Sequence, residues 1–484
     1  MRRFKAGERA AAGQMTVVLV VLVSLLHLLV IGRIDLSVDE AHYALYGQWP
    51  DWSYFDHPPL VGWLQALILP FSSHEFALRL WPLVLGAAAS LLLYRLTREL
   101  FPEESPWVAF AAVGLLQSAV IFQLLSIALV PELPLLVFSL ASMLFLQRLV
   151  AGGHGGNWLL LGLCLGLAGL SKYTAVTLVV TALLYILWQG QGRLLLTLRL
   201  WGAAVLALLV ISPVIYWNAT HDWLSFNYQL GHGMPQRGWE LARFLRAQAG
   251  QLLAYAPGIF LFGLVALVAA RRELGHPGVR LLLTLAVPPL LLFGWSSGFE
   301  ETLPHWTLLV WAALAPLTAR WLVRWWQGSG VRYTAYFSLA YSMLLTLFIH
   351  GQFAFGGMPF EPYNHPLRDL YGWRDAAVHG LTLRQGEEPL LVGNWSLASR
   401  IAWYARPAAV IVTDSRYDQF DLWYGSPRTG QGGLLLVPDY YEGRDAVSGL
   451  SHFTECQKID ELEVVLDATP VHRFTYYRCS GFHG

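Results

Sequence analysis

Residues 15–31 read MTVVLVVLVSLLHLLVI and contain no Asp, Glu, Lys or Arg. An α-helix needs about 20 mainly apolar residues to cross the hydrocarbon core of a bilayer. A basic start, MRRFK, precedes this stretch, but no small-residue cleavage site follows it, so we interpret it as a retained first membrane helix. Similar stretches recur along the chain and predict an α-helical polytopic membrane protein of about eleven transmembrane helices. These spans are expected near residues 15–33, 77–97, 106–125, 132–150, 157–171, 174–190, 200–217, 249–270, 279–296, 306–323 and 333–352.

The composition agrees with a membrane protein. Of 484 residues, 55% are hydrophobic and 13% are charged, whereas a soluble globular chain carries about 25% charged residues. A soluble enzyme is therefore excluded. The formal net charge is zero, so the chain has no basic excess of the kind that nucleic-acid binding requires.

The orientation is predicted from Lys and Arg in the short connections. With the N-terminus in the cytoplasm, fifteen of these residues lie on the inner side and six on the outer side of the predicted membrane domain. We expect a multi-pass protein of the cell inner (plasma) membrane. Its extracytoplasmic segments are predicted to be residues 34–76 (the first outer loop), the turn at 130–132, residues 218–248, residues 297–305 and the tail from about 353.

The tail lacks long apolar runs. Short β-like stretches at residues 389–392, 409–412 and 433–437 alternate with helix-like ones such as 396–404, which predicts a small C-terminal extracytoplasmic (periplasmic) α/β domain. The expected division is residues 1–352 for the transmembrane domain and 353–484 for this tail domain. Cys456 and Cys479 both lie in the tail, where an oxidising compartment would permit a bridge between them.

The first outer loop contains acids, histidines and aromatic residues. It reads DLSVDEAHY at residues 35–43 and WPDWSYFDHPPL at residues 49–60. Interfacial Trp and Tyr explain the aromatic residues of a solvated loop, but they do not explain the adjacent Asp39 and Glu40 at the membrane edge. Low-dielectric surroundings raise the pKa of a carboxylate toward the range that suits a general base. Asp39 and Glu40 are therefore the candidate catalytic residues.

Cationic residues on the outer side are candidates for binding a phosphate. Lysine is rare in the chain, and Lys172 lies between two apolar runs. It either extends to the lipid headgroups or pairs with an anion in a cavity, and its rarity favours the anion. Three arginines of the loop 218–248 oppose the topology rule and suggest a phosphate partner, although anionic headgroups are an alternative. These arginines are Arg237, Arg243 and Arg246.

Two further residues add to this outer face. Glu132 lies between Pro131 and Pro134, where a helix N-terminal acid favoured by the macrodipole is the simple explanation. His305 closes an outer turn, where a lone histidine is ordinarily interfacial. An outward cavity with carboxylates and cations suits a reaction between a hydroxyl group and a membrane-borne phosphate ester. No GxxxxGK[ST], HExxH or GxSxG motif occurs in the sequence.

The combination of these elements resembles the GT-C class of multi-spanning glycosyltransferases that use polyprenyl-phosphate sugars. This class includes the lipid A aminoarabinose transferases and the protein O-mannosyltransferases. The aminoarabinose transferases tend to have Lys before the Pro-Pro pair, where this chain has His57, and many members have Asp where this chain has Glu132. The matching elements are Asp39-Glu40 followed by Tyr43, residues 55–60 (FDHPPL), Lys172-Tyr173-Thr174, residues 303–306 (LPHW) and residues 369–373 (DLYGW).

The resemblance implies a glycosyltransferase with a GT-C helical domain and an extracytoplasmic α/β domain. It implies that Asp39 is the catalytic acidic residue and that a sugar passes from a polyprenyl-phosphate donor to a lipid, glycan or protein hydroxyl, with inversion. Glu40 or Glu132 would orient the sugar or share a divalent metal cation, and no ligand set in the sequence decides whether a metal is used. Lys172, Arg237, Arg243 and His57 are the expected donor-phosphate contacts, and Tyr43, Glu132, Tyr173 and His305 the other cavity residues.

Two other classes of protein remain open at this point. A secondary transporter or lipid flippase would use charged residues near the membrane midplane, whereas these residues gather at one face. A non-catalytic envelope assembly protein would tolerate the replacement of Asp39. The sequence names neither the sugar nor the acceptor.

Overall fold

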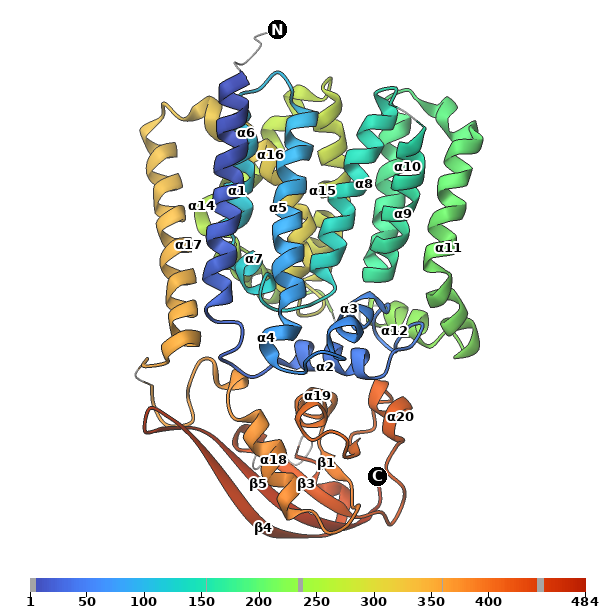
Figure 1. Ribbon diagram of the computed structural model, residues 1–484, viewed down its shortest axis with the longest axis vertical. Coiled ribbons are helices and arrows are strands. Elements are labelled where there is room, and N and C mark those ends of the chain that lie inside the picture. The colour runs from blue at the N-terminus through green and yellow to red at the C-terminus, as the bar shows by residue number, and fades with distance from the viewer. Residues whose placement is uncertain (1–5, 154, 234–237, 359, 442–447) are drawn as a thin grey trace. The chain divides into compact units, whose positions relative to one another are not determined.

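The computed structural model describes residues 6–153, 155–233, 238–358, 360–441 and 448–484 (Figure 1). The chain divides into two compact units. The first, called the helical unit below, comprises Met1–Leu28, His57–Leu60 and Leu80–Ile349. The second, called the mixed unit, comprises Leu29–Asp56, Val61–Arg79 and His350–Gly484.

The helical unit consists of membrane-type helices and short connecting turns. Its helices are α1 (Ala6–Leu28), α5 (Leu80–Leu100), α6 (Pro106–Gln117), α7 (Val120–Leu125), α8 (Glu132–Val150), α9 (Gly156–Ser171), α10 (Val176–Trp188), α11 (Leu198–Thr220), α12 (Leu224–Gly233), α13 (Leu241–Ala254), α14 (Pro257–Ala270), α15 (Pro277–Ser296), α16 (Leu308–Trp325) and most of α17 (Ser329–Phe355). Short 3-10 turns connect them at Tyr173–Ala175 (η1), Gly192–Leu196 (η2), Arg271–Glu273 (η3) and Pro304–Thr307 (η4).

The predicted polytopic helical fold is confirmed. Among the described residues, 7 helices are long and apolar enough to cross a membrane, or up to 8 if a bent helix pair is one span. Three shorter apolar helices, Pro106–Gln117, Gly156–Ser171 and Tyr173–Trp188, coincide with other predicted spans. The eleven expected segments are thus all helical, although several are shorter than a regular span.

Two of the expected spans are broken. The span predicted at 106–125 is divided at Ser118 and Ala119 into α6 and α7. The span predicted at 249–270 is divided between α13 and α14, which are bent by 107°. Ala256 adopts a positive φ of 63° at this break and Pro257 begins α14, and a proline disfavours helical backbone at the residue before it. The bend therefore has a local cause that the hydrophobic pattern does not report.

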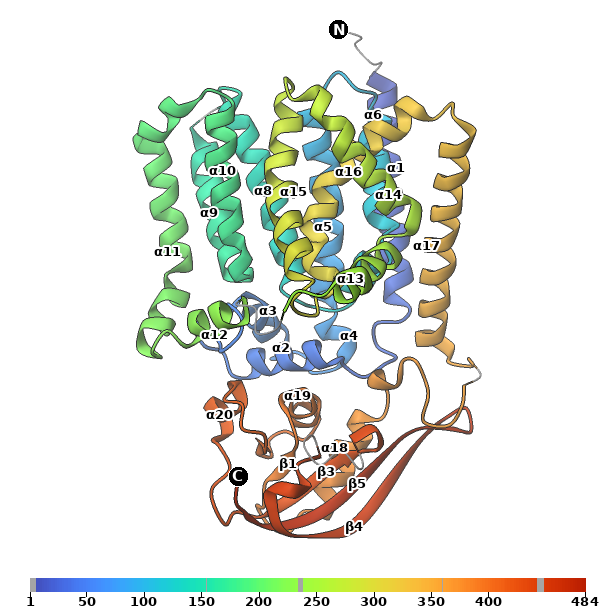
Figure 2. The same cartoon turned by 180° about the vertical axis from the view of Figure 1, so that it is seen from behind.

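The helices of this unit pack side by side as a bundle. α8 packs on α5 and α9, and α9 packs on α11, while α17 lies on the opposite side of the bundle from α11 (Figures 1 and 2). Glycines of α9 allow close approach to α11, because a Cβ at Gly162 would lie 2.4 Å from the Ala203 carbonyl oxygen. Lipid-facing residues such as Leu208, Leu209 and Val205 remain exposed on α11.

The mixed unit combines helices from two distant parts of the chain with one sheet. Its helices are α2 (Val38–Gln48), α3 (Leu60–Ile68), α4 (Glu75–Leu78), α18 (Trp373–Leu383), α19 (Trp395–Tyr404) and α20 (Gln419–Tyr424), with 3-10 turns at Arg368–Leu370 (η5), Asp439–Tyr441 (η6) and Leu450–His452 (η7). Its strands are β1 (Leu390–Val392), β2 (Val410–Val412), β3 (Gly433–Pro438), β4 (Phe453–Leu466) and β5 (Thr469–Phe482).

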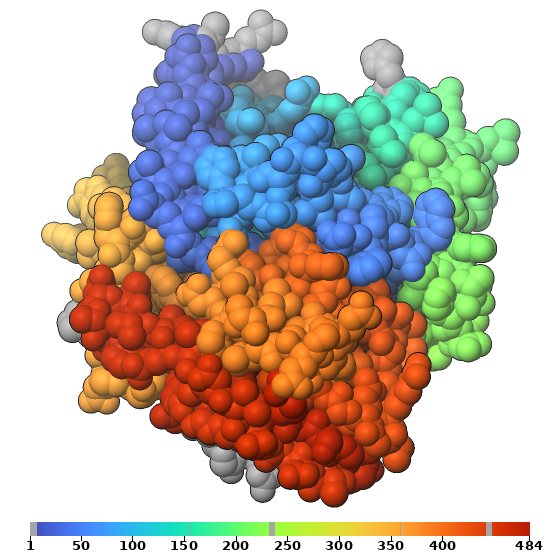
Figure 3. Space-filling view, turned by 60° about the horizontal axis from the view of Figure 1, so that its bottom comes forward, coloured from blue at the N-terminus to red at the C-terminus, as the bar shows by residue number. Residues whose placement is uncertain are grey.

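The five strands form one sheet of order β2-β1-β3-β5-β4. β1 pairs parallel with β2 and β3, whereas β5 pairs antiparallel with β3 and β4. Cys456 and Cys479 are directly opposite on β4 and β5 and form a disulfide. The space-filling view shows the helical part of the tail in orange beside its β-hairpin in red (Figure 3). The expected α/β character of the tail is confirmed.

The mixed unit includes much of the first outer loop as well as the tail. Its buried core joins Leu36, Ala41 and Leu45 with Ile401 and Trp403. The Tyr404 hydroxyl accepts a hydrogen bond from the Leu36 backbone N–H at 2.8 Å. These segments share a core because neither is long enough to bury its apolar side chains by itself.

Candidate functional site

A cluster of charged side chains lies within the helical unit. The Lys172 Nζ is 2.5 Å from the Glu132 Oε1, and the His305 Nε2 is 3.3 Å from the same oxygen. The exposed fractions of these side chains are 14% for Lys172, 6% for Glu132 and 18% for His305. A carboxylate this well buried is stable as an ion only with such partners. The sequence-predicted residues Lys172, Glu132 and His305 are thus brought together.

Three different connections present these side chains. Glu132 is the first residue of α8, so its carboxylate lies at the positive end of a helix. Lys172 follows α9 in extended conformation, with its backbone N–H donating to the Ala168 carbonyl oxygen at 3.1 Å. His305 lies in the short η4 turn before α16. The cluster therefore forms where the ends of three elements meet.

Side chains at the break between α13 and α14 hold the η4 turn. The Tyr255 hydroxyl donates to the Pro304 carbonyl oxygen at 3.0 Å. The Gln251 Oε1 accepts from the Thr307 hydroxyl at 2.7 Å and from the Trp311 Nε1 at 3.2 Å. These bonds fix the backbone on both sides of His305.

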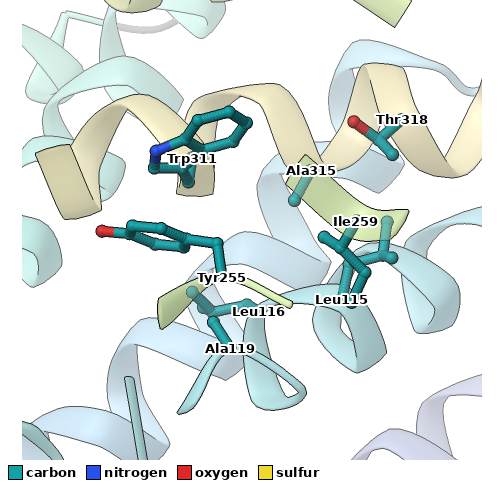
Figure 4. Close-up of a pocket in the computed structure, with 8 residues that line it drawn as sticks. All are labelled: Leu115, Leu116, Ala119, Tyr255, Ile259, Trp311, Ala315 and Thr318. Atoms are coloured by element: carbon teal, nitrogen blue, oxygen red, sulfur yellow. The ribbon is translucent and has the colours of Figure 1, made fainter. Parts of the chain in front are cut away.

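The rings of Tyr255 and Trp311 also line an apolar pocket (Figure 4). The remaining lining residues are Leu115, Leu116, Ala119, Ile259, Ala315 and Thr318. The hydroxyl of Tyr255 is directed away from this apolar lining, toward the Pro304 carbonyl. The bent α13–α14 pair thus contributes to both an apolar pocket and the support of the charged cluster.

Two more predicted residues lie near the cluster. His57 is close enough to Glu132 to interact with it electrostatically. Tyr173 follows Lys172 directly, and its ring packs edge-on against Phe226 of α12 with a centroid separation of 5.5 Å. Lys172 also lies 5.9 Å from the centre of the Trp306 ring. A lysine and two imidazoles therefore surround one carboxylate.

The three arginines that the sequence suggested as phosphate contacts differ in their surroundings. Arg243 pairs with Glu240 at 2.9 Å and donates to the carbonyl oxygens of Gly298 and Phe299. Its guanidinium thus connects the start of α13 to the backbone that follows α15. Arg246 is exposed. Arg237 lies outside the described residues.

The two candidate catalytic acids lie in the first turn of α2, within the mixed unit. Ser37 caps this helix, and Glu40 completes a capping box by accepting from the Ser37 backbone N–H at 3.1 Å. Glu40 also pairs with Arg79, which donates from Nε at 2.7 Å and from Nη2 at 3.0 Å. Glu40 is 4% exposed, so its carboxylate serves the local fold, whereas the neighbouring Asp39 is half-buried.

A buried histidine continues from the same helix. The His42 Nδ1 is 3.1 Å from the Ser399 hydroxyl of α19, and its Nε2 is 3.7 Å from Asp56. The Tyr46 hydroxyl donates to Asp56 as well. Tyr43, one turn beyond Asp39, is buried with its ring centroid 5.5 Å from that of Tyr46. These contacts fix the orientation of α2 and hence of Asp39 on it.

Sequence reasoning did not find Arg79 or His42 as structural partners. Arg79 was not singled out from the sequence, although its position near the start of the second predicted span could have marked it as a buried cation that needs an acid. His42 lies within the quoted DLSVDEAHY stretch, but its contact with Ser399 spans 357 residues. No local signal reports such a pair.

The acids that the sequence offered as cation ligands have basic partners. Glu40 contacts Arg79, and Glu132 contacts Lys172 and His305. Within the described ranges, no group of three or more His, Cys, Asp or Glu residues has an arrangement that could hold a metal ion.

Comparison with known sequences gives a consistent result. The family model described as dolichyl-phosphate-mannose-protein mannosyltransferase matches residues 56–217. The chain is 26% identical to the lipid A galacturonosyltransferase RgtD of Rhizobium johnstonii over 402 residues, which covers 81% of this chain and 77% of the relative. It is 28% identical to the lipopolysaccharide core galacturonosyltransferase RgtA of the same organism over 188 residues, 38% of this chain and 37% of that protein.

Comparison with solved structures supports the fold. ArnT from Cupriavidus metallidurans, bound to undecaprenyl phosphate, superposes with a TM-score of 0.64 at 17% identity, and the match covers 95% of this chain and 97% of that chain. The apo form of the same protein superposes with a TM-score of 0.61 at 16% identity, covering 96% and 98%. The architecture of this chain is therefore that of ArnT along nearly its whole length.

Proposed function

Because the chain belongs to the GT-C class of membrane glycosyltransferases, we propose that it transfers a sugar from a polyprenyl-phosphate carrier to a hydroxyl group at the extracytoplasmic face of the inner membrane. The observation that carries this proposal is the buried cluster of Lys172, Glu132 and His305. A lysine held in a largely buried position is suited to an anionic group that arrives from the lipid phase.

The leaving group defines what the cluster has to do. When the bond between the anomeric carbon and the phosphate oxygen breaks, its electron pair passes to that oxygen, and the lipid phosphate gains one negative charge. Lys172 stabilises this charge in the transition state, where fixed cations lower the barrier directly. His305 and His57 are the next cationic groups available to it when protonated.

Glu132 sets the charge of the cluster before the donor binds. Its carboxylate neutralises Lys172, so the cluster contains no uncompensated buried cation. The ammonium group of Lys172 has three N–H donors. It can therefore contact an incoming phosphate while it keeps a hydrogen bond to Glu132.

Asp39 is the proposed general base. The acceptor hydroxyl gives its proton to the Asp39 carboxylate while its oxygen attacks the anomeric carbon, and the polyprenyl phosphate departs from the opposite side. A single displacement of this kind inverts the configuration at the anomeric carbon. Asp39 suits the role better than Glu40, because both oxygens of Glu40 are occupied by Arg79 and the Ser37 cap.

The acceptor we favour is a lipopolysaccharide-type glycolipid. The two curated relatives are named as transferases of lipid A and of the lipopolysaccharide core, and ArnT was crystallised with undecaprenyl phosphate. These names support an envelope glycolipid as acceptor and a polyprenyl phosphate as carrier.

The test is a transfer reaction with purified full-length protein in nanodiscs. A polyprenyl-phosphate sugar and lipid A are supplied, and mass spectrometry follows the glycosylated lipid and the released polyprenyl phosphate. We expect the two products to appear in equal amounts, with inversion at the anomeric carbon by NMR. Release of the carrier without glycosylation of any hydroxyl acceptor, or movement of the donor across the membrane without bond cleavage, would reject the proposal.

A further inference from the structure

An arginine of the mixed unit, Arg406, stacks on a buried aromatic ring. Arg406 follows α19, and its guanidinium carbon lies 3.3 Å from the centre of the Trp403 ring. Trp403 is 1% exposed, so the ring is a fixed platform. Stacking uses the face of the guanidinium and leaves its five N–H donors in the plane, directed to the sides.

No hydrogen bond or ion pair of the Arg406 side chain is found among the residues that the structure describes. Its side chain is neither fully buried nor exposed, and burial lowers the pKa of its guanidinium to about 10. A partly desolvated cation gains from a neighbouring anion, because burial has removed part of its hydration. No Arg406 nitrogen is among the buried atoms of the described residues that lack a hydrogen-bond partner, so its N–H donors remain open to an incoming anion.

The carboxylate in electrostatic range of Arg406 has other hydrogen-bond partners. Glu75 lies within electrostatic range of Arg406, but its carboxylate already accepts from Arg374 and from the Tyr404 hydroxyl. Arg374 adds a second positive charge in the same range, and Tyr424 is a further neighbour. Two guanidinium groups thus share one carboxylate.

We propose that Arg406, with Arg374 beside it, forms a binding site for the phosphate group of a lipid. Phosphate oxygens match the planar fork of a guanidinium and accept two parallel hydrogen bonds from it. A phosphate here would neutralise Arg406 without displacing Arg374 from Glu75. The stack on Trp403 holds the fork in one orientation, which reduces the ordering that binding requires.

Two sources could supply a lipid phosphate. One is the acceptor, if it is a phosphorylated glycolipid, and this source rests on the proposed function. The other is an anionic phospholipid of the surrounding membrane. Both present the same chemistry to Arg406, and they differ in whether the site contributes to substrate recognition or to anchoring.

The test measures binding of inorganic phosphate to the full-length protein in detergent, at constant ionic strength and without a sugar donor. We expect phosphate to raise the melting temperature of the wild type and Arg406→Gln to weaken its affinity at least about tenfold. The matched control is Arg428→Gln, which removes an exposed arginine of the same unit and should leave the affinity unchanged. Equal phosphate affinity of the wild type and Arg406→Gln would overturn the proposal.

A second, conservative variant distinguishes loss of the guanidinium geometry from misfolding of the protein. Arg406→Lys keeps the charge but loses the planar fork, and we expect it to bind phosphate several-fold more weakly than the wild type. If it binds as tightly as the wild type, the stacked-fork geometry is rejected.

Competition in nanodiscs separates the two sources. If a phospholipid occupies the site, discs containing phosphatidylglycerol weaken phosphate binding to the wild type relative to discs of phosphatidylcholine alone. If the acceptor occupies it, lipid A competes and phosphatase-treated lipid A does not. Competition by neither lipid overturns the assignment to a lipid phosphate. Because these measurements involve no turnover, their failure is distinguishable from a failure of the proposed transferase activity.

Discussion

The Nζ of Lys172 lies 2.5 Å from the Oε1 of Glu132, and this ion pair connects the C-terminal end of α9 to the first residue of α8. A lysine that only extended to the lipid headgroups would be exposed at its tip and would need no partner. Lys172 is instead largely buried and paired. Lys172 thus pairs with an anion of the chain itself, and its contact with a donor phosphate stays a prediction.

Replacement of Lys172 should impair catalysis in the proposed reaction. We expect Lys172→Met to lower kcat roughly a hundredfold, because about 3 kcal/mol of transition-state stabilisation of the leaving phosphate is lost. Lys172→Arg should recover only part of the activity, since its planar fork needs a different geometry. The measurements are kcat and donor KM in nanodiscs, normalised to folded protein.

A double variant separates stability from catalysis. Lys172→Met alone leaves Glu132 as a buried unpaired charge, which should lower the melting temperature. Adding Glu132→Gln removes that charge, so the double variant should regain stability while its activity stays low. Wild-type activity in the double variant would show that Lys172 serves only to neutralise Glu132.

Asp39→Asn keeps the shape of the side chain and removes the proposed base. We expect turnover to fall by roughly 10²–10⁴ with little change in melting temperature. Glu40→Gln is the matched comparison on the same helical turn. It should mainly lower the melting temperature, because it weakens the buried pair with Arg79, while activity per folded molecule is retained. If the two variants behave in the reverse manner, Glu40 replaces Asp39 as the candidate base.

The predicted orientation can be tested with single cysteines. Glu387→Cys lies on an exposed loop of the mixed unit, and Gln191→Cys on an exposed turn after α10. In intact spheroplasts a membrane-impermeant maleimide should label Cys at 387 and not at 191, because fifteen basic residues are predicted inside against six outside. The native Cys164 is buried and Cys456 is paired with Cys479, so background labelling should be low. The opposite pattern would invert every role proposed for the outer face.

The stability of the mixed unit should depend on pH through Asp418. Burial raises the pKa of Asp418 from 3.8 to about 6; the residue is 3% exposed, and its Oδ1 accepts from the Phe420 backbone N–H at 2.7 Å. Between pH 4 and 6 the folded chain holds a proton that the unfolded chain has lost. The free energy of unfolding should therefore fall as pH rises through this window, by roughly 2–3 kcal/mol, and level off above it.

Asp418→Asn tests this pH dependence. Asparagine keeps the helix cap on α20 and carries no charge, so the variant should be more stable than the wild type at pH 7.5 and should lose the slope between pH 4 and 6. Melting temperatures measured across that range provide the comparison. Glu387→Gln, an exposed change of the same kind, should keep the wild-type slope. An unchanged slope in Asp418→Asn would assign the effect to another group.

Much of the helical architecture could be predicted from the sequence, because a membrane helix makes its backbone hydrogen bonds within itself and requires a long run of apolar residues. The positions where helices are broken could not be predicted. Pro257 gives a local reason for the bend after Ala256, but proline is tolerated inside α11, α15 and α16 of the same chain. Whether a proline ends a helix depends on what packs against the freed backbone.

The candidate site was predicted in part. Lys172, Glu132 and His305 were singled out one by one, from rarity, flanking prolines and a family element, without any indication that they contact one another. Arg243 was singled out for opposing the topology rule, but no signal in the sequence indicated that its guanidinium binds backbone carbonyls after α15. Sequence position reports that a charge is unusual, but it does not report which partner removes the cost of burying it.

The sequence by itself determined that this protein has many membrane-type helices and that an α/β tail follows them, because these properties depend on composition and local periodicity. Only the tertiary structure decided which charges are paired. Glu132 and Lys172 are 40 residues apart, Glu40 and Arg79 are 39 apart, and His42 and Ser399 are 357 apart. A buried charge is stable beside any suitable partner, and the packing of distant elements selects which one it contacts.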